Sequence, residues 1–356
     1  MNSTLVSLSV NSILHGSPMF VNPMKIDRMS VFMSFSTVFL NSPVTVKRST
    51  FKQVIGSVLV LDYGFREIYR SQQELQSSFK ECVFTEIEGC ALYCASAFTI
   101  AIDNCLFSNN HYSASGYACT YFTAANSVKI TRCCYSHCDY DYSAYGINSH
   151  SAKIPQCHVN QTAEYASGWT HATHGSWSGA QGDFRNTFNN ATLCKATKCR
   201  AGFCFTPHNA SAYIRFDTAT NNSAVSTLSL CTPGYSFLSH FNLIMNKASH
   251  GLVEYAHGPS KAEMNGFVLV GNEFPSIDCV YPSFSYGAAR FTSSFFDSEK
   301  PSSVATSFAD DCHFSTVREF NDIYSQTCYR GATTEFTASS NVCFVLITLI
   351  FAQFLL

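Results

Sequence analysis

Two tryptophans and two histidines lie within nine residues of one another, at Trp169, His171, His174 and Trp177. Tryptophan rings stack on sugars and imidazoles form hydrogen bonds, so these residue types suit a loop that binds a ligand. They equally suit a loop whose rings fold back onto the protein body, and two histidines alone make a weak metal site. We treat the four residues as a candidate ligand-binding site and assign no metal.

Carboxylates are a second source of chemistry, because paired acids can cleave glycosidic bonds. Two close aspartate pairs are Asp139 with Asp141 and Asp310 with Asp311. Such pairs are more typical of solvated turns. We therefore assign no catalytic residue and expect no cofactor.

Cysteine is unusually frequent, with 17 in the chain. Four cysteines recur at comparable positions of a repeated pattern: Cys82, Cys105, Cys133 and Cys157. If they occupy one position of successive coils, their Cα atoms lie about 4.8 Å apart, within reach of a disulfide. The alternative is a ladder of buried thiols that fills the core. No C-x-x-C pair is present, so we do not expect zinc.

Glycosylation sequons begin at Asn2, Asn160, Asn190, Asn209 and Asn221. If the protein is secreted, we expect glycans at Asn160, Asn190, Asn209 and Asn221, which fall at predicted turns or loops.

The elements that position these residues follow a short repeat. It consists of an apolar residue, any residue, a second apolar residue, any two residues, Cys or Ser, any residue, and a final aromatic or apolar residue. Clear copies are Val44-Val46-Ser49-Phe51, Phe79-Cys82-Phe84, Ile100-Ile102-Cys105-Phe107, Val128-Ile130-Cys133-Tyr135 and Ile154-Cys157-Val159. Weaker copies end at Leu243, Leu269, Phe296 and Phe314, with Phe188 and Phe216 as degenerate members. A second row, of predicted left-handed turn residues, contains Asn110, Asn160, Asn190, Asn222, Asn246 and Asn272.

These copies recur about every 26 residues, and apolar residues alternate rather than following a helical period. A period built of strands and turns suits one coil of a parallel β-helix, which buries its apolar face on its neighbours. The composition agrees, with 31 Phe and 18 Tyr but only 13% charged residues. The sequence therefore predicts an all-β solenoid of roughly ten coils over residues 44–314.

The Cys-x-Phe ending of the frame, the Asn turns and the strand Gly89-Cys90-Ala91-Leu92-Tyr93 resemble the pectin-lyase-like right-handed parallel β-helix. The likeness extends from about Val44 to Phe314. More narrowly, the pattern is similar to surface β-helix proteins of parasitic protists and to polymorphic outer membrane proteins of intracellular bacteria. The resemblance implies a right-handed solenoid and a surface role.

The last fifteen residues, 342–356, are uncharged and mostly apolar, and they form a C-terminal hydrophobic tail. Gly331 begins a small triplet, and a polar spacer follows, in the order of a glycolipid-anchor signal with Gly331 as attachment site. A short transmembrane segment is the alternative. Residues 315–341 are expected to form a terminal coil and spacer. Residues 1–43 are expected to form a cap or an atypical signal, with Met24 as an alternative start.

The net charge of −2 argues against a nucleic-acid partner. We expect a non-catalytic, membrane-attached protein of the cell surface, with an adhesive, display or structural role. Its expected partners are the membrane, through the tail, and host or cell-surface glycans or proteins. The alternative is a carbohydrate-active enzyme of the pectin-lyase-like type. That enzyme would need Asp139, Asp141 and a base such as Arg132 or Lys153 in one groove.

Overall fold

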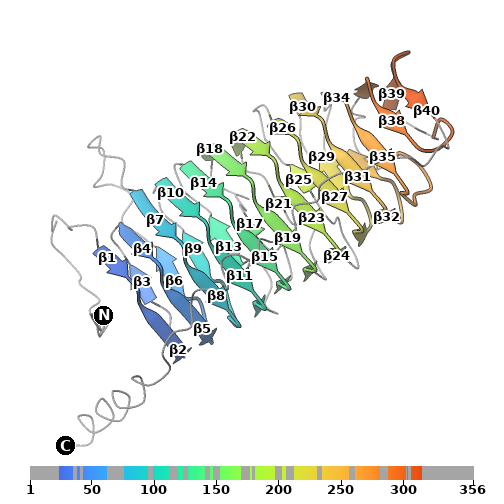
Figure 1. The fold of residues 1–356 in the computed structure, drawn as a ribbon. Coiled ribbons are helices and arrows are strands. Elements are labelled where there is room, and N and C mark those ends of the chain that lie inside the picture. The colour runs from blue at the N-terminus through green and yellow to red at the C-terminus, as the bar shows by residue number, and fades with distance from the viewer. Residues whose placement is uncertain are drawn as a thin grey trace, which may run out of the picture.

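The computed structural model describes residues 24–34, 38–40, 43–61, 76–94, 99–112, 119–122, 127–140, 145–146, 153–169, 177–178, 181–196, 203–205, 212–230, 235–255, 261–280, 288–301, 303 and 306–314. The described residues form forty strands and no helix. Every pair of neighbouring strands is parallel, and the strands stack into an elongated rod (Figure 1). The predicted all-β parallel solenoid is confirmed.

Four sheets run along the rod, which we name A to D. Sheet A contains twelve strands: β1 (Met24–Asp27), β4 (Val44–Lys47), β7 (Gln76–Lys80), β10 (Thr99–Asp103), β14 (Ser127–Thr131), β18 (Lys153–Asn160), β22 (Gln181–Thr187), β26 (Ala212–Arg215), β30 (Tyr235–Ser239), β34 (Lys261–Asn265), β37 (Ala288–Thr292) and β39 (Thr306–Phe308). Sheet B also contains twelve: β2 (Ser30–Ser34), β5 (Thr50–Val54), β8 (Val83–Thr85), β11 (Leu106–Ser108), β15 (Cys134–Ser136), β19 (Ala163–Tyr165), β23 (Asn190–Thr192), β27 (Thr218–Thr220), β31 (Asn242–Ile244), β35 (Val268–Val270), β38 (Phe295–Phe296) and β40 (His313–Phe314).

Sheets C and D complete the coil with shorter strands. Sheet C contains β3 (Val38–Leu40), β6 (Leu59–Leu61), β9 (Leu92–Cys94), β13 (Thr120–Phe122), β17 (Tyr145–Gly146), β21 (Trp177–Ser178), β25 (Phe203–Phe205), β29 (Leu228–Leu230), β33 (Val253–Tyr255) and β36 (Asp278–Val280). Sheet D contains β12 (His111–Tyr112), β16 (Asp139–Tyr140), β20 (Gly168–Trp169), β24 (Lys195–Ala196), β28 (Ser223–Ala224) and β32 (Lys247–Ala248).

We call a sheet A strand and the strands that follow it one rung, numbered 1 to 12 along the chain. The described part of the ladder starts at Met24, and its strands β1, β2 and β3 pair with β4, β5 and β6. Residues 24–40, predicted as part of a cap or signal, therefore supply rung 1. Sheets A and B each have twelve strands, against roughly ten predicted coils, and rung 1 has Met29 where the frame has Cys or Ser.

Two sharp corners bracket nearly every sheet B strand. Corner 1 lies between sheets A and B, and corner 2 follows sheet B. In nine successive rungs the corners are five residues apart, at 48/53, 81/86, 104/109, 132/137, 161/166, 188/193, 216/221, 240/245 and 266/271. All these residues have φ between 47° and 66°, the left-handed region. One residue in this conformation turns the chain without breaking the contact between rungs.

The residue after each corner, which we call the inner residue, is buried or partly buried, and in many rungs its side chain accepts a hydrogen bond from a backbone amide of the rung before it. At corner 2, the backbone amides of Cys194 and Asn222 donate to the Oδ1 atoms of Asn222 and Asn246, at 2.8 and 3.1 Å. At corner 1, the amides of Thr162 and Asn189 donate to Asn189 Oδ1 and Asp217 Oδ1, at 2.9 and 2.7 Å. The inner side chain of one rung thus satisfies a buried amide of the rung before it.

In other rungs a cysteine sulfur atom is the hydrogen-bond partner of the backbone in the rung before it. The backbone of Ser49 hydrogen-bonds to Cys82, that of Asn110 to Cys138, and that of Ser167 to Cys194. Where an inner residue accepts such a hydrogen bond, its side chain is small and has an acceptor atom, whereas Val54, Ile87, Phe241 and Phe267 fill the same slot in other rungs with apolar groups.

The predicted asparagine row is partly wrong in its register. Asn110, Asn222, Asn246 and Asn272 lie at corner 2, but as inner residues, and the left-handed residues precede them. Asn160 ends β18 and Asn190 begins β23, so neither lies at a corner. The prediction failed because an amide acceptor and a left-handed turn favour the same residue type.

Inward side chains of sheet B form the most regular row of the core. Phe51, Phe84, Phe107 and Tyr135 stack with ring centroids 5.0, 4.9 and 4.6 Å apart. The row continues through Glu164, Ala191 and Ala219, and becomes apolar and larger again at Leu243, Leu269, Phe296 and Phe314. The core is therefore aromatic towards both ends and small or polar in rungs 6–8.

The frame was misread in these middle rungs. Cys157 pairs with Val128 on sheet A, so it does not continue the row of Cys82, Cys105 and Cys133, whose slot Thr162 takes in rung 6. Phe188 and Phe216 are corner 1 residues, 49% and 43% exposed, and not inward residues of sheet B. The search for apolar residues failed here because the inward positions are small or polar while aromatic residues lie outside.

Candidate interaction surface

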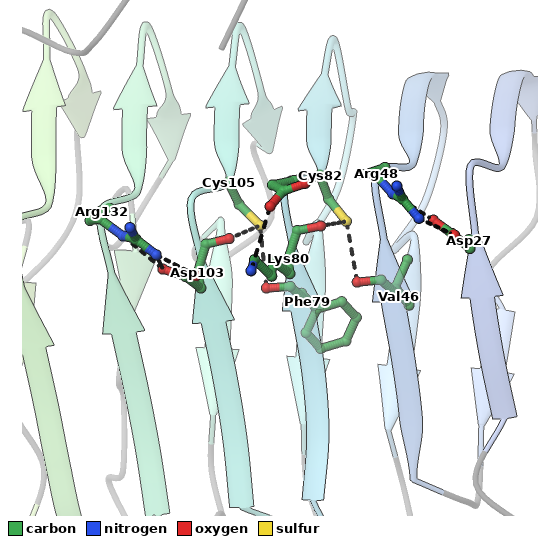
Figure 2. A network of polar contacts seen from close by, with 10 residues as sticks. Asp27, Val46, Arg48, Phe79, Lys80, Cys82, Asp103, Cys105 and Arg132 are labelled. Carbon is green, nitrogen blue, oxygen red and sulfur yellow. Dashed lines mark hydrogen bonds and ion pairs between the residues drawn. The ribbon is translucent and has the colours of Figure 1, made fainter. Parts of the chain in front are cut away.

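Corner 1 presents a row of side chains along the rod, and its chemistry changes from one end to the other. In the N-terminal rungs the row is charged and paired, with Asp27 bound to Arg48 and Asp103 bound to Arg132 (Figure 2). The Arg132 Nη2 atom lies 2.7 and 2.6 Å from the two carboxylate oxygens of Asp103, in the neighbouring rung. Exposed pairs of this kind tie adjacent rungs together and leave little net charge.

In rungs 7–9 the same row becomes aromatic. The rings of Phe188 and Phe216 lie 4.8 Å apart with planes 7° from parallel, and His240 continues the stack at 4.9 Å from Phe216. The next corner residue is Gly266, whose missing Cβ would lie 3.4 Å from His240 Cδ2. The stack therefore ends at a residue without a side chain.

Further aromatic and apolar side chains border this stack on both sides. On the outer face of sheet A, Tyr213 is 40% exposed, and the Arg215 guanidinium lies 5.5 Å from the centroid of the Phe237 ring. At corner 2, Leu193 and Met245 are 40% and 58% exposed. Five of the six large hydrophobic side chains found exposed in the described part of the chain belong to rungs 7–9. We call this region the aromatic sector, comprising Phe188, Leu193, Tyr213, Arg215, Phe216, Phe237, His240 and Met245.

The charges of the aromatic sector are distributed unevenly between surface and core. Among described residues of rungs 7–9, the exposed charged or histidine side chains are Arg185, Lys195, Arg215, His240, Lys247 and His250. Asp183 lies in β22, and the two carboxylates of these rungs whose burial is described, Asp217 and Glu254, are completely buried. The charged side chains described as exposed in these rungs are therefore cationic, and Lys247 is paired to Glu273 of the next rung.

Asp217 is held inside the rod by neighbouring amides. Its Oδ2 accepts from Asn186 Nδ2 at 2.6 Å, and its Oδ1 accepts from the Asn189 backbone amide at 2.7 Å. Burial raises the pKa of Asp217 well above 3.8, although these hydrogen bonds act in the opposite direction. The cluster stabilises a polar core beneath the exposed aromatic stack.

The predicted Trp and His site is only partly described. Trp169 lies in β20 of sheet D and Trp177 in β21 of sheet C, so the two residues belong to different sheets. Their strands pair with neighbours in the ladder. His171 and His174 lie outside the described residues. The aromatic sector was missed from the sequence, where Phe188 and Phe216 were taken as core residues.

Two residues of the enzymatic alternative, Arg132 and Asp139, lie on opposite sides of the sheet B strand of their rung. Arg132 lies at corner 1, where it binds Asp103, while Asp139 begins β16 beyond corner 2. Lys153 begins β18 in sheet A, and Asp141 lies outside the described residues. Asp311 Oδ2 accepts a hydrogen bond from Ser293 Oγ at 2.7 Å, which with the Ser293 backbone lowers its pKa.

The four predicted cysteines are buried free thiols. Three of them form a short ladder at corner 1, in which the Cys105 side chain contacts those of Cys82 and Cys133 (Figure 2 shows Cys82 and Cys105). Each thiol also hydrogen-bonds to main-chain oxygens, as Cys82 does to Val46 and Lys80 at 3.6 and 3.3 Å. The structure therefore has the thiol ladder rather than inter-coil disulfides at these positions. Groups of three or more metal-binding side chains are not found among the described residues.

The sequons fall in different environments. Asn221 is exposed at corner 2, whereas Asn190 is 3% exposed and accepts a hydrogen bond from Thr192 at 2.9 Å. Asn160 is partly buried, and its Oδ1 accepts from Thr187 at 3.0 Å. Asn209 lies outside the described residues. Of the three sequon asparagines that the structure describes, Asn221 has the most accessible side chain.

Gly331 and the tail at 342–356 also lie outside the described residues. Within the part of the chain that is described, no helix is long and apolar enough to cross a membrane. The sequence matches no protein-family model and no curated protein. The parallel β-solenoid is thus established from the strand pairing alone.

Proposed function

We propose that the protein is a membrane-attached β-helix of the cell surface with an adhesive, display or structural role, without catalytic activity. The observation that carries this proposal is the aromatic sector, an exposed apolar surface on the side of a regular rod. Contiguous exposed apolar surface on a soluble protein commonly marks an interaction site. A rod also offers its whole length to partners, as other solenoids do.

The same proposal includes the type of coil, the mode of membrane attachment and the glycans. A right-handed, pectin-lyase-like coil related to surface β-helix proteins of protists or intracellular bacteria would be consistent with the parallel sheets and short corners. Attachment through a glycolipid near Gly331, or through a short spanning segment, follows from the apolar tail. Glycans at exposed positions such as Asn221 would accompany secretion.

Buried thiols are compatible with an oxidising exterior. Burial raises the pKa of the Cys105 and Cys157 thiols, which keeps them in the unreactive protonated form. The enzymatic alternative is less well supported, since Arg132 is bound to Asp103 rather than directed at Asp139.

Surface staining of cells that express the full chain tests this proposal. An epitope inserted within residues 113–118, between β12 and β13, avoids the described strands. We expect staining of unpermeabilised cells, and its removal by phosphatidylinositol-specific phospholipase if the anchor is a glycolipid. Staining that resists the enzyme would favour a spanning tail. Staining seen only after permeabilisation would overturn the surface location.

A further inference from the structure

We propose that the aromatic sector binds an acidic, partly apolar segment of another protein. This inference names the partner of the surface on which the proposed adhesive function rests, and it depends on that function for its biological setting. Its physical basis lies in the chemistry that rungs 7–9 display.

The first argument is that rungs 7 and 8 are inverted relative to most others, while rung 9 keeps Leu243 as its inward residue. The inward positions of rungs 7 and 8 on sheet B are Ala191 and Ala219, and their inner residues at corner 1 are Asn189 and Asp217. Large apolar side chains lie outside instead, at Phe188, Phe216 and Met245. Elsewhere corner 1 carries polar or small residues, so exposed rings are not a requirement of the fold.

The second argument concerns which part of the rings a partner can reach. Because Phe188, Phe216 and His240 are stacked nearly parallel, each ring covers the face of the next. Sugars bind aromatic rings through their faces, which this stack leaves largely covered. Ring edges, which carry the positive part of the quadrupole, are what such a stack offers to solvent. Edges of this kind attract carboxylates.

The third argument is charge complementarity. Arg185, Lys195 and Arg215 are exposed in these rungs, while the carboxylates Asp217 and Glu254 are buried. An anionic partner therefore meets exposed cations, whereas these two acids lie inside the rod. The three cations are fewer than the 4–8 Lys or Arg typical of an anionic membrane site. Nucleic acids require a more basic surface still.

A protein segment also fits the apolar part of the sector. Leu193 and Met245 at corner 2 lie across sheet B from the aromatic stack, five residues from Phe188 and His240 respectively. A peptide with both carboxylates and apolar side chains would contact the cations and ring edges at corner 1 and these side chains at corner 2. A polyanion without apolar side chains would leave Leu193 and Met245 uncovered.

Fluorescence anisotropy with the purified full chain tests the proposal. The probe is a fluorescein-labelled peptide of repeated Glu-Glu-Leu, and its matched control repeats Gln-Gln-Leu. We expect the acidic peptide to bind, the Gln peptide to bind at least about tenfold more weakly, and added salt to weaken binding. Arg215→Gln and, separately, Phe216→Ser should each weaken binding about tenfold. Lys129→Gln removes an exposed cation from the outer face of rung 5 and should leave binding unchanged.

Circular dichroism and thermal melting of each variant show that the rod is intact, which exposed substitutions should preserve. The proposal would be overturned if the acidic peptide did not bind, or if the Gln peptide bound as tightly as the acidic one. It would also be overturned if both sector variants bound the acidic peptide as tightly as the wild type does. Binding of heparin or of phosphatidylserine vesicles without binding of the peptide would also overturn it. Surface staining is a separate measurement, so failure of the peptide test leaves the cellular location standing, and the converse holds too.

Discussion

At the scale of single residues, the inner corner positions explain why this rod contains so many small polar side chains and cysteines. Many corners leave an amide that sheet pairing does not satisfy, and the next rung supplies an acceptor, as Ser49, Asn110, Asn222 and Asn246 do. A buried amide without a partner costs about 1–3 kcal/mol. The sulfur of Cys138 serves in the same slot, so cysteine here need not indicate a cross-link.

Asp217 is the one inner residue of this kind that carries a titratable carboxyl group in the described part of corner 1. Burial raises its pKa well above 3.8. The folded protein therefore retains a proton that the unfolded chain releases near pH 4. Its contribution to stability is complete below that pH and is lost as the pH rises through the folded pKa.

We therefore expect the free energy of unfolding of the wild type to fall, relative to Asp217→Asn, as the pH is raised from 4 to 8. Each unit by which the folded pKa exceeds the unfolded value contributes about 1.4 kcal/mol to this difference. Urea unfolding at several pH values measures it. Glu164 and Glu254 are buried in both proteins, so their effects cancel. Parallel pH profiles for the two proteins would contradict the prediction.

At the scale of elements, the corners impose a steric condition on the sequence. Among the described residues, eighteen other than glycine have positive φ, including Phe188, Leu193 and Met245, and none of the eighteen is β-branched. The left-handed region is least accessible to β-branched side chains. The five-residue spacing of the corners therefore depends on the absence of Val, Ile and Thr as much as on the presence of Asn.

Gln161 offers a clean test, because it is exposed at corner 1 with φ of 50°. Gln161→Val should destabilise the rod by about 1–3 kcal/mol, the usual strain of a disfavoured backbone conformation. Gln161→Gly should have a much smaller effect, since glycine adopts this conformation freely. The matched control is Lys129→Val on an exposed strand position, where valine is well accommodated. Urea unfolding compares the variants, and equal effects of valine at the two sites would show that corner strain is unimportant.

The same elements show how far the sequence could predict this structure. The sequence placed correctly the rungs in which a small inner residue is followed two positions later by an aromatic inward residue. Examples are Cys82-x-Phe84 and Cys105-x-Phe107. Rung 6 was misplaced because Glu164 occupies the inward position and Cys157 mimics the frame on sheet A. Hydrophobic pattern cannot recover a rung whose core is polar and whose aromatic residues lie outside. The aromatic sector escaped prediction for the same physical reason.

At the scale of the whole molecule, the rod consists of two aromatic cores joined by a small and polar one. The stack from Phe51 to Tyr135 occupies rungs 2–5, and Phe296 stacks on Phe314 at 4.9 Å in the last two rungs. Between them, rungs 6–8 present Glu164, Ala191 and Ala219 to the core. In a solenoid each rung contacts only its neighbours, so stability is a sum of local terms.

This arrangement predicts that the two ends lose structure independently. Phe107→Ala should remove about 3–5 kcal/mol of packing between Phe84 and Tyr135, and Phe296→Ala should have a comparable effect at the other end. Hydrogen–deuterium exchange with mass spectrometry measures where protection is lost. We expect Phe107→Ala to deprotect residues 44–140 while residues 261–314 keep theirs, and Phe296→Ala to give the reverse. Uniform loss along the rod in both variants would mean that the small, polar rungs transmit stability as well as the aromatic ones do.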